Sequence, residues 1–493
     1  MATDAAMAAR IREAAAEIVD THRVPGISIG VVQGDELVFC EGFGFADLES
    51  REPMTPERRQ RIASITKTMV GLCAMAAVDE GKLRLEDRVT DLLPEVKFEG
   101  PVETMTVRHL LTHTSGIGEA PTVARLADIA NPDRAAIQQP GDFSTLYPNG
   151  IVVEVAPGSK YAYCNNGYGL LGEIIVRAEG AALQDVMQRR IWDPLGMTST
   201  DILDANDERI TSCYHRAPDE DRRVQLGRAG IPVKDEPTVD GLNIKGKFTA
   251  DFNQGMRAAG GVQSTVPDMA KYASALLRQA EGVVRPGTFA AMTSAHHGGD
   301  SRMVAWGLSF ARTPVRVDGE QPSQWKQLIG HGGAYFGGWN SHLDVIPELG
   351  IGIIQHMNIM LDEPAPLFRK VIRAVVGAEA PRHEQRAADA QILATAPGMY
   401  MLSMPGPLTN FRPATNVGYV NVSADGDRLM LESRWGKWKT PVALTPCDPD
   451  DPAFFAVLTP GADPAYVVFD RDAAGNVTGL RRDELVVMHK RTV

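Results

Sequence analysis

The sequence predicts an α+β domain followed by a small β-barrel domain. Helix-like and strand-like segments alternate over about three quarters of the 493 residues. Residues 377–390 are polar, alanine-rich and charged, as expected for a linker. Short strand candidates at regular spacing follow, which is typical of a small barrel or sandwich. We therefore expect domains at residues 1–378 and 396–493, joined by a linker at 379–395.

The first elements are a helix, a β-hairpin and a second helix. Apolar side chains between Met1 and Asp20 recur at helical spacing. Residues 27–33 and 37–45 are apolar runs separated by Gly34-Asp35, which is a hairpin signal. After a polar stretch that contains proline, a helix should run from Ser64 to near Gly81.

Helices dominate the middle of the first domain, and strands return at its end. Helical periodicity marks residues 107–113 and 165–178, whereas the polar residues 205–256 indicate an insertion, a lid over a site or a long surface excursion. Strand patterns then recur at residues 306–312, 325–329, 339–346 and 351–357. A closing helix at 366–376 should follow them and pack on the first helix. The last domain contains strand candidates at residues 419–422, 428–432, 454–458, 466–469 and 485–489.

Composition excludes several classes of protein. The net charge of −12 argues against nucleic acid or an anionic membrane as the main partner. The segment from Met1 to Asp20 lacks the continuous apolar core of a secretory signal, and no stretch of the chain is apolar enough for a membrane span. The five scattered cysteines indicate reduced thiols and lack metal-ligand spacing. We therefore expect a cytoplasmic protein that does not span a membrane.

The run Ser64-Ile65-Thr66-Lys67 is the strongest chemical signal in the chain. Side chains at i and i+3 lie on one face of a helix, so the hydroxyl and the amine can meet. A serine hydroxyl needs a neighbouring base to become a good nucleophile, and a desolvated lysine can be that base. The positive end of the helix dipole also favours a developing alkoxide.

Three further segments support this pair. Tyr163-Cys164-Asn165 follows Lys160, and a tyrosine hydroxyl beside an ammonium group has a lowered pKa and can shuttle protons. His331-Gly332-Gly333 contains paired glycines that let a substrate lie against a strand edge. Residues 259–265 indicate a tight turn that enters a helix at Asp268.

With these segments in this order, residues 10–376 resemble the serine β-lactamase and penicillin-binding-protein-like family. The resemblance is greatest to its class C β-lactamase, D-aminopeptidase and esterase branch. Ser64-x-x-Lys67 matches the first family motif, Tyr163-x-Asn165 the second, and His331-Gly332-Gly333 the Lys-Thr-Gly or His-x-Gly position. The runs LLTHTSG at 110–116 and PLGM at 194–197 also look like family landmarks.

The resemblance implies a fold and a set of roles. An antiparallel sheet would form from the N-terminal hairpin and the strands after Trp306, with terminal helices packed on it and the site beside a helical region. Ser64 would be acylated, and Lys67 and Tyr163 would share general-base and general-acid work. Asn165 would position the substrate amide or the lysine. The backbone N–H groups of Ser64 and Ala334 would form the oxyanion hole.

His331 departs from many relatives, which carry lysine there. Histidine is largely neutral at pH 7, which argues against strong binding of a substrate carboxylate and so against penicillin-like substrates. We therefore predict a hydrolase that cleaves an ester or a small peptide or amide without a cofactor or metal. The alternatives are an acyltransferase and a penicillin-interacting protein with slow deacylation. The C-terminal domain would gate the site, bind a partner or mediate homo-oligomerisation.

Other residues have competing interpretations. Gly26-Ile27-Ser28-Ile29-Gly30 fits a nucleophile elbow, but the pattern continues as a strand where an elbow needs a helix, so Ser28 is expected to be an ordinary strand residue. His109 and His113 are four positions apart, and packing or capping is favoured over metal binding because no third ligand is evident. Three aromatic residues could line a pocket or belong to the core: Tyr335, Phe336 and Trp339.

Overall fold

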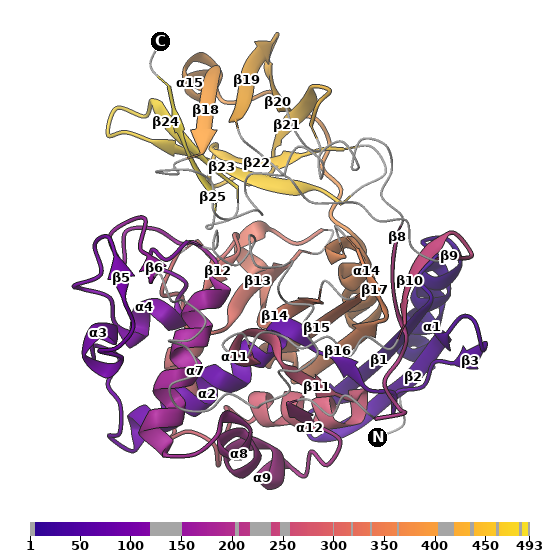
Figure 1. Cartoon of the computed structure of the whole chain (residues 1–493). Coiled ribbons are helices and arrows are strands. Elements are labelled where there is room, and N and C mark those ends of the chain that lie inside the picture. The colour runs from indigo at the N-terminus through magenta and orange to yellow at the C-terminus, as the bar shows by residue number, and fades with distance from the viewer. Residues whose placement is uncertain are drawn as a thin grey trace.

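The computed structural model of the chain shows an antiparallel sheet flanked by helices, with a closed barrel at one end (Figure 1). The described residues are 5–118, 150–202, 207–216, 238–246, 257–298, 300–316, 319–335, 338–361, 364–402, 419–433, 438–459, 463–482 and 486–491. Within them, no helix is both long enough and apolar enough to cross a bilayer.

The central sheet is made from strands at the beginning and the end of the part of the chain that precedes the barrel. Its strands are β1 (Gly26–Gln33), β2 (Glu36–Asp47), β3 (Glu52–Pro53), β12 (Ala305–Trp306), β13 (Ala311–Val315), β14 (Lys326–Tyr335), β15 (Trp339–Ile346) and β16 (Ile351–Met357). Their order is β12-β13-β14-β15-β16-β1-β2-β3. The hairpin β1–β2 joins the later strands because β1 pairs antiparallel with β16, from Ile27 opposite Met357 to Gln33 opposite Ile351.

Each face of this sheet packs on helices. Helices α1 (Ala5–Asp20) and α14 (Ala365–Val376) lie together on one face, where Ile11 and Val371 share a core with Ile353. Arg10 Nε donates to the carbonyl oxygen of Ala374 at 2.9 Å across these two helices. Helix α12 (Val266–Leu277) covers the other face, whose core extends to α2 (Thr66–Asp79). The sheet is therefore buried on both sides, which explains its continuous apolar strands.

The described residues before the barrel also form a helical region and three small sheets. The other α-helices among these described residues are α3 (Val89–Leu92), α4 (Val107–Leu111), α7 (Asn165–Glu179), α8 (Leu183–Met187), α9 (Asp193–Leu195), α11 (Arg257–Gly260) and α13 (Thr288–Thr293). One small sheet has the order β4-β11-β7, from β4 (Gln60–Arg61), β7 (Asp201–Ile202) and β11 (Val262–Ser264). A second has the order β17-β8-β10-β9, from β8 (Cys213–Arg216), β9 (Thr238–Val239), β10 (Leu242–Gly246) and β17 (Ile359–Met360). The third pairs β5 (Phe98–Glu99) with β6 (Ile151–Val152).

After α15 (Ala390–Thr395), eight strands close into a barrel. They are β18 (Gly398–Leu402), β19 (Tyr419–Asp425), β20 (Arg428–Ser433), β21 (Val442–Pro446), β22 (Phe454–Val457), β23 (Ala465–Arg471), β24 (Val477–Arg482) and β25 (Val486–Lys490). Strand alternation gives the barrel two apolar surfaces. Phe455 belongs to the interior core of the barrel, whereas its neighbour Phe454 packs against Trp325 and Met303 of the first part of the chain.

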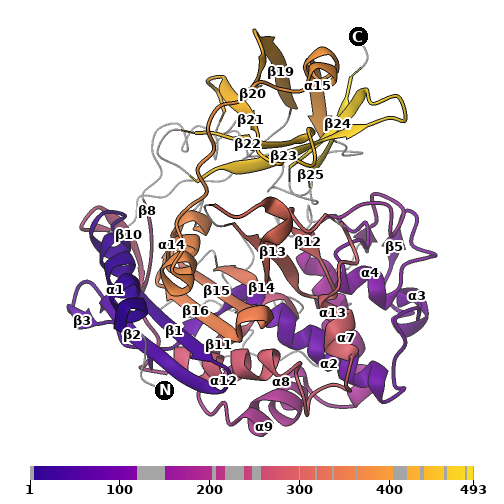
Figure 2. The same ribbon diagram turned by 180° about the vertical axis from the view of Figure 1, so that it is seen from behind.

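The barrel docks above β12, β13 and α14 in both views (Figures 1 and 2). Asp463 of the barrel accepts from Arg369 Nε at 3.1 Å and from Arg373 Nη1 at 2.9 Å, both on α14. Arg302, which precedes β12, forms ion pairs with Asp448 and Asp451 of the barrel. Ionic contacts thus flank the apolar cluster around Phe454. The barrel and the part of the chain that precedes it therefore share an interface with an apolar centre and charged surroundings.

The expected fold class is confirmed, with differences in detail. The predicted strand 306–312 is two strands, β12 and β13, separated by a tight turn. Strand β14 runs on to Tyr335, so the His331 motif lies inside a strand. The helix expected at Asp268 begins at Val266, after the N-cap residue Thr265. The sequence patterns missed the barrel strands β18, β21 and β24. The expected insertion lies mainly outside the described residues, and its described parts supply β8, β9 and β10.

Candidate active site

Ser64 lies in a short 3-10 turn, η1 (Ala63–Ile65), that leads directly into α2. The residue before it, Ala63, has φ +47°, a left-handed conformation that is strained for a residue with a Cβ atom. Lys67 is fully buried one helical turn later, and its Nζ donates to Ser64 Oγ at 3.0 Å and to the carbonyl oxygen of Ala259 at 2.5 Å. Two hydrogen bonds, one to the hydroxyl and one to a backbone oxygen, therefore fix the position of the amine.

The turn before Ser64 is fixed by three surrounding elements. Ile62 N–H donates to the carbonyl oxygen of Val262 at 3.0 Å, and Val262 N–H donates to Thr66 Oγ1 at 3.1 Å. From β15, Ser341 Oγ donates to the carbonyl oxygen of Ile62 at 2.8 Å. A Cβ atom at Gly333 would lie 2.2 Å from that same carbonyl oxygen. The glycine thus lets β14 approach the nucleophile turn closely.

Tyr163 lies beside Lys67 at the entry to α7. Lys67 Nζ is 5.0 Å from the centroid of the Tyr163 ring and 5.4 Å from that of Tyr168. The adjacent Cys164 is the N-cap of α7, and its Sγ accepts from Gly167 N–H at 3.3 Å. Tyr168 is held by its hydroxyl, which donates to Ser309 Oγ at 2.7 Å, and burial raises its pKa. Both rings thus lie against the lysine, and the Tyr163 ring is the nearer of the two.

His113 contacts three consecutive residues around Tyr163. Its ring stacks on the Tyr163 ring with centroids 4.2 Å apart, and its backbone oxygen accepts from Ala162 N–H at 2.7 Å. Its Nδ1 accepts from Cys164 N–H at 3.1 Å, so in the neutral ring the proton lies on Nε2. His113 is 1% exposed and has φ +56°. This buried, strained histidine therefore restrains Tyr163 through contacts with its ring and with the backbone on both sides of it.

His331 stands where β14 has an open edge. Strand β13 pairs with β14 only as far as Gly330, so residues 331–335 extend past it. His331 Nδ1 lies 2.6 Å from the carbonyl oxygen of Gly332, which can only accept, so Nδ1 carries a proton. The indole of Trp306 meets the imidazole of His331 edge-on at 5.3 Å and the ring of Tyr163 at 6.0 Å. Trp306 thus bridges the tyrosine and the strand edge.

The structure brings most of the sequence-predicted residues to one place. Lys67 lies next to both Ser64 and Tyr163, and Gly333 brings β14 into contact with the turn before Ser64. Gly332 and Ala334 flank that contact on β14, opposite His342 and Asn340 of β15. Asn165 is partly exposed at the first position of α7, directly after Cys164.

The competing candidates have other places. Ser28 lies within β1 between β2 and β16, and its Oγ donates to the carbonyl oxygen of Thr55 at 3.1 Å. His109 closes the capping box of α4 with Thr106. Tyr335 and Trp339 pack with Ala63 in a small core cluster, whereas Phe336 lies outside the described residues. In the described part of the chain, no cluster of His, Cys, Asp or Glu is arranged to hold a metal ion.

Sequence reasoning missed a connected group of four rings beside Tyr163, which we call the pocket wall: His113, Tyr161, His297 and Trp306. The ring of Tyr161 contacts His113, His297 and Trp306 at centroid distances of 5.9, 5.5 and 5.6 Å. The run LLTHTSG contains His113 and was recognised as a family landmark. No local pattern indicates that the ring of His113 stacks on a tyrosine from a distant segment. The wall is assembled from three separate segments, which explains why it was missed.

In this site a buried lysine is hydrogen-bonded to a serine in the turn before a helix, and the sheet of the same unit has helices on both faces. These features define a serine hydrolase of the β-lactamase and transpeptidase fold. The beta-lactamase family model matches residues 11–377, and the chain belongs to that family. It is 28% identical over 353 residues to "Esterase EstB" of Burkholderia gladioli, covering 66% of this chain and 86% of that protein. It is 25% identical over 373 residues to "Beta-lactamase" of Escherichia coli K12, covering 71% and 88%.

A solved structure extends the likeness through the barrel. An octameric penicillin-binding protein homologue from Pyrococcus abyssi aligns with 98% of this chain and all of its own, with a TM-score of 0.60 and 23% identity. At that identity the likeness concerns the fold. The arrangement of hydrolase unit and C-terminal barrel is therefore one that a solved structure shares.

Proposed function

We propose that the protein cleaves an ester, or a small amide or peptide bond, through an acyl-enzyme on Ser64. The contact between Lys67 Nζ and Ser64 Oγ carries this proposal, because it places a base on the nucleophile before substrate arrives. Lys67, helped by Tyr163, takes the hydroxyl proton as Ser64 Oγ attacks the carbonyl carbon. Tyr163 then gives a proton to the leaving group, and water releases the acid.

The negative oxygen formed during attack needs donors at the nucleophile turn. We propose the backbone N–H groups of Ser64 and Ala334 for this role, with Asn165 orienting the substrate and His331, Gly332 and Gly333 lining the strand edge. The close approach of Gly333 to the carbonyl oxygen of Ile62 supports this placement. Each such donor is typically worth about 3 kcal/mol in the transition state.

An uncharged ester or amide is the favoured substrate class. His331 presents an imidazole, which is a weaker partner for a carboxylate than a lysine ammonium. The similarity to an esterase supports the ester over a lactam. We further propose a cytoplasmic protein with a hydrolase domain at 1–378, a linker at 379–395 and a barrel domain at 396–493. The octameric relative supports a homo-oligomer.

Steady-state hydrolysis of p-nitrophenyl acetate and butyrate, D- and L-alanyl anilides, short peptides and a chromogenic cephalosporin tests the proposal. Ser64→Ala should reduce kcat by about 10⁴-fold or more, since the acyl-enzyme cannot form. Ser28→Ala is the matched control, and its kcat should stay near that of the natural protein. Turnover that survives Ser64→Ala would refute the proposal. A stable adduct on Ser64 would indicate slow deacylation, and acyl transfer to an added alcohol would indicate a transferase.

A further inference from the structure

The segment that carries Trp306 links the pocket wall to the barrel. Its described residues are 296–298 and 300–306. At one end His297 and Trp306 face each other, with Trp306 N–H donating to the oxygen of His297 at 3.0 Å and His297 N–H donating back at 2.9 Å. The His297 ring also stacks on Tyr161 at 5.5 Å. We call residues 296–298 and 300–306 the wall hairpin.

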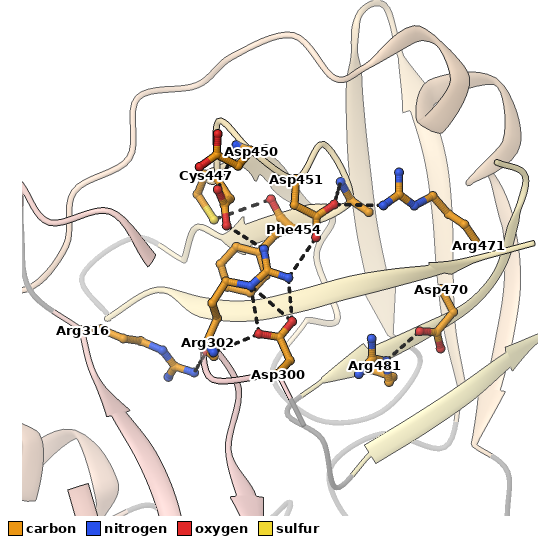
Figure 3. A network of polar contacts seen from close by, with 12 residues as sticks. Asp300, Arg302, Arg316, Cys447, Asp450, Asp451, Phe454, Asp470, Arg471 and Arg481 are labelled. Atoms are coloured by element: carbon orange, nitrogen blue, oxygen red, sulfur yellow. Dashed lines mark hydrogen bonds and ion pairs between the residues drawn. The ribbon is translucent and has the colours of Figure 1, made fainter. Parts of the chain in front are cut away.

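The other end of the wall hairpin is bound to the barrel by Arg302 (Figure 3). Its guanidinium donates to Asp300 within the hairpin at 2.6 Å, to Asp448 at 2.6 Å and to Asp451 at 2.9 Å. The same group lies 4.4 Å from the centroid of the Phe454 ring. Bidentate and multiple charge-assisted bonds of this kind fix orientation as well as position. The tip of the hairpin is therefore bound by barrel residues, in addition to Gln327 of β14, whose Nε2 donates to the carbonyl oxygen of Ser301 at 2.8 Å.

Apolar packing strengthens this attachment beside Arg302. Met303 is fully buried in the cluster that contains Trp325, Phe454 and Tyr466. Trp306 follows Met303 by three positions, a separation that spans about 10 Å at most in an extended chain. After Trp306 the chain is held by the hydrolase part, because Leu308 N–H donates to the oxygen of Met292 at 2.7 Å. Trp306 thus lies between two anchored positions, one of which, at Arg302 and Met303, contacts the barrel.

We propose that Arg302 is a positioning residue through which the barrel holds the wall hairpin, and with it Trp306 and His297, against the substrate pocket. The barrel thereby sets the width of the pocket beside Tyr163 and His331. This inference rests on the proposed function, since it assigns the wall to an ester or amide pocket. Substrates with a bulky acyl or leaving group depend on the barrel contact, whereas an acetyl ester depends on it little.

The interface offers a matched control. Asp463 binds Arg369 and Arg373 of α14, which packs on α1 and carries no residue of the pocket wall. Asp463→Asn therefore weakens barrel docking away from the wall hairpin. Asp448→Asn weakens it at Arg302 from the barrel side, and leaves the sequence of the hairpin unchanged. Arg302→Lys retains the charge and loses the fork geometry.

Hydrogen–deuterium exchange and ester kinetics on the full chain test the proposal together. We expect Arg302→Ala and Asp448→Asn to speed exchange of the Trp306 amide at least tenfold, and to raise KM for a bulky aryl ester at least fivefold. The kcat for p-nitrophenyl acetate should change less than twofold, and Arg302→Lys should recover part of the loss. Asp463→Asn should leave the Trp306 amide and both kinetic constants unchanged.

Equal effects of Asp463→Asn and Asp448→Asn, or an unchanged Trp306 amide in Arg302→Ala, would overturn the inference. Failure of the proposed function is distinguishable from this result. If no ester or amide is hydrolysed in a Ser64-dependent way, the kinetic readout is lost and the exchange of Trp306 still decides whether the barrel holds the wall hairpin.

Discussion

At the scale of single residues, the pocket depends on a histidine that holds a tyrosine. His113 uses its backbone oxygen, its ring face and its Nδ1 on Ala162, Tyr163 and Cys164 in turn. The ring therefore restrains the position of Tyr163 relative to Lys67. A base or acid that is misplaced by about 1 Å can lower the rate by about 100-fold, so this restraint bears on catalysis.

Two substitutions at His113 separate its contacts. His113→Asn keeps an acceptor near the position of Nδ1 and tolerates the positive φ, but it loses the ring on Tyr163. We expect its kcat to fall about fivefold with KM nearly unchanged, because the stack is worth about 1 kcal/mol. His113→Phe keeps the ring and leaves the Cys164 N–H without its acceptor. If both variants retain full kcat on p-nitrophenyl butyrate, His113 has no positioning role.

At the scale of elements, the proposed mechanism requires β14 to lie close to the turn before Ser64. Gly333 packs on the carbonyl oxygen of Ile62, two positions before Ser64, while Ser341 of β15 donates to that oxygen. The carbonyl oxygen of Ile62 thus contacts both strands, and this contact fixes them next to the start of the helix that follows Ser64. In the proposed mechanism, the separation of the strand and the helix determines where a substrate carbonyl lies between Ser64 and Ala334.

Gly333→Ala tests this approach. The added Cβ would lie 2.2 Å from the oxygen of Ile62 and 2.2 Å from Ser341 Oγ, so β14 must move away. We expect kcat/KM to fall about 100-fold or more, with a smaller loss of stability. Gly332→Ala is the neighbouring control, because its Cβ would lie 3.3 Å from a side-chain atom of His342, which has room to adjust. Comparable losses in the two variants would contradict the argument.

At the scale of the whole molecule, the central sheet buries a histidine, and the protonation of this histidine makes the stability of the fold depend on pH. His356 on β16 faces Ser28 on β1 and Ser341 on β15. It is fully buried, and neither ring nitrogen has a hydrogen-bond partner within the described ranges. Burial lowers its pKa to about 4 from the usual 6.5, because the charged ring would lose its hydration. The folded protein therefore favours the neutral ring.

This shift makes the protein less stable in acid. Above pH 6.5 the ring is neutral in both states and costs nothing in protonation. As the pH falls from 6.5 towards 4, the unfolded chain takes up a proton that the folded chain does not, so the free energy of unfolding decreases. The decrease reaches about 3 kcal/mol. Urea titrations at pH 7 and pH 4.5 should show it, and His356→Leu should lose it. An identical pH dependence in both proteins would refute the assignment.

Much of the fold was predictable because its signals are local. The hairpin β1–β2, the helix after Ser64 and the helices α7 and α14 each follow from the spacing of apolar residues within one segment. The prediction failed where neighbours decide the outcome. Residues 306–312 read as one strand, but Gly307 packs on the oxygen of Met292 and the chain turns there. Barrel strands such as β21 are short and become regular only through their partners.

The sequence by itself predicted the pairing of Ser64 with Lys67, because two side chains three positions apart meet within a single helical turn, and the order of its motifs predicted the family. Only the tertiary structure decided what surrounds that pair. His113 comes from a segment far from the one that carries His297 and Trp306, and Arg302 ties that second segment to a barrel near the end of the chain. Contacts over such separations depend on how packed elements meet in space, and no periodicity within a segment records them.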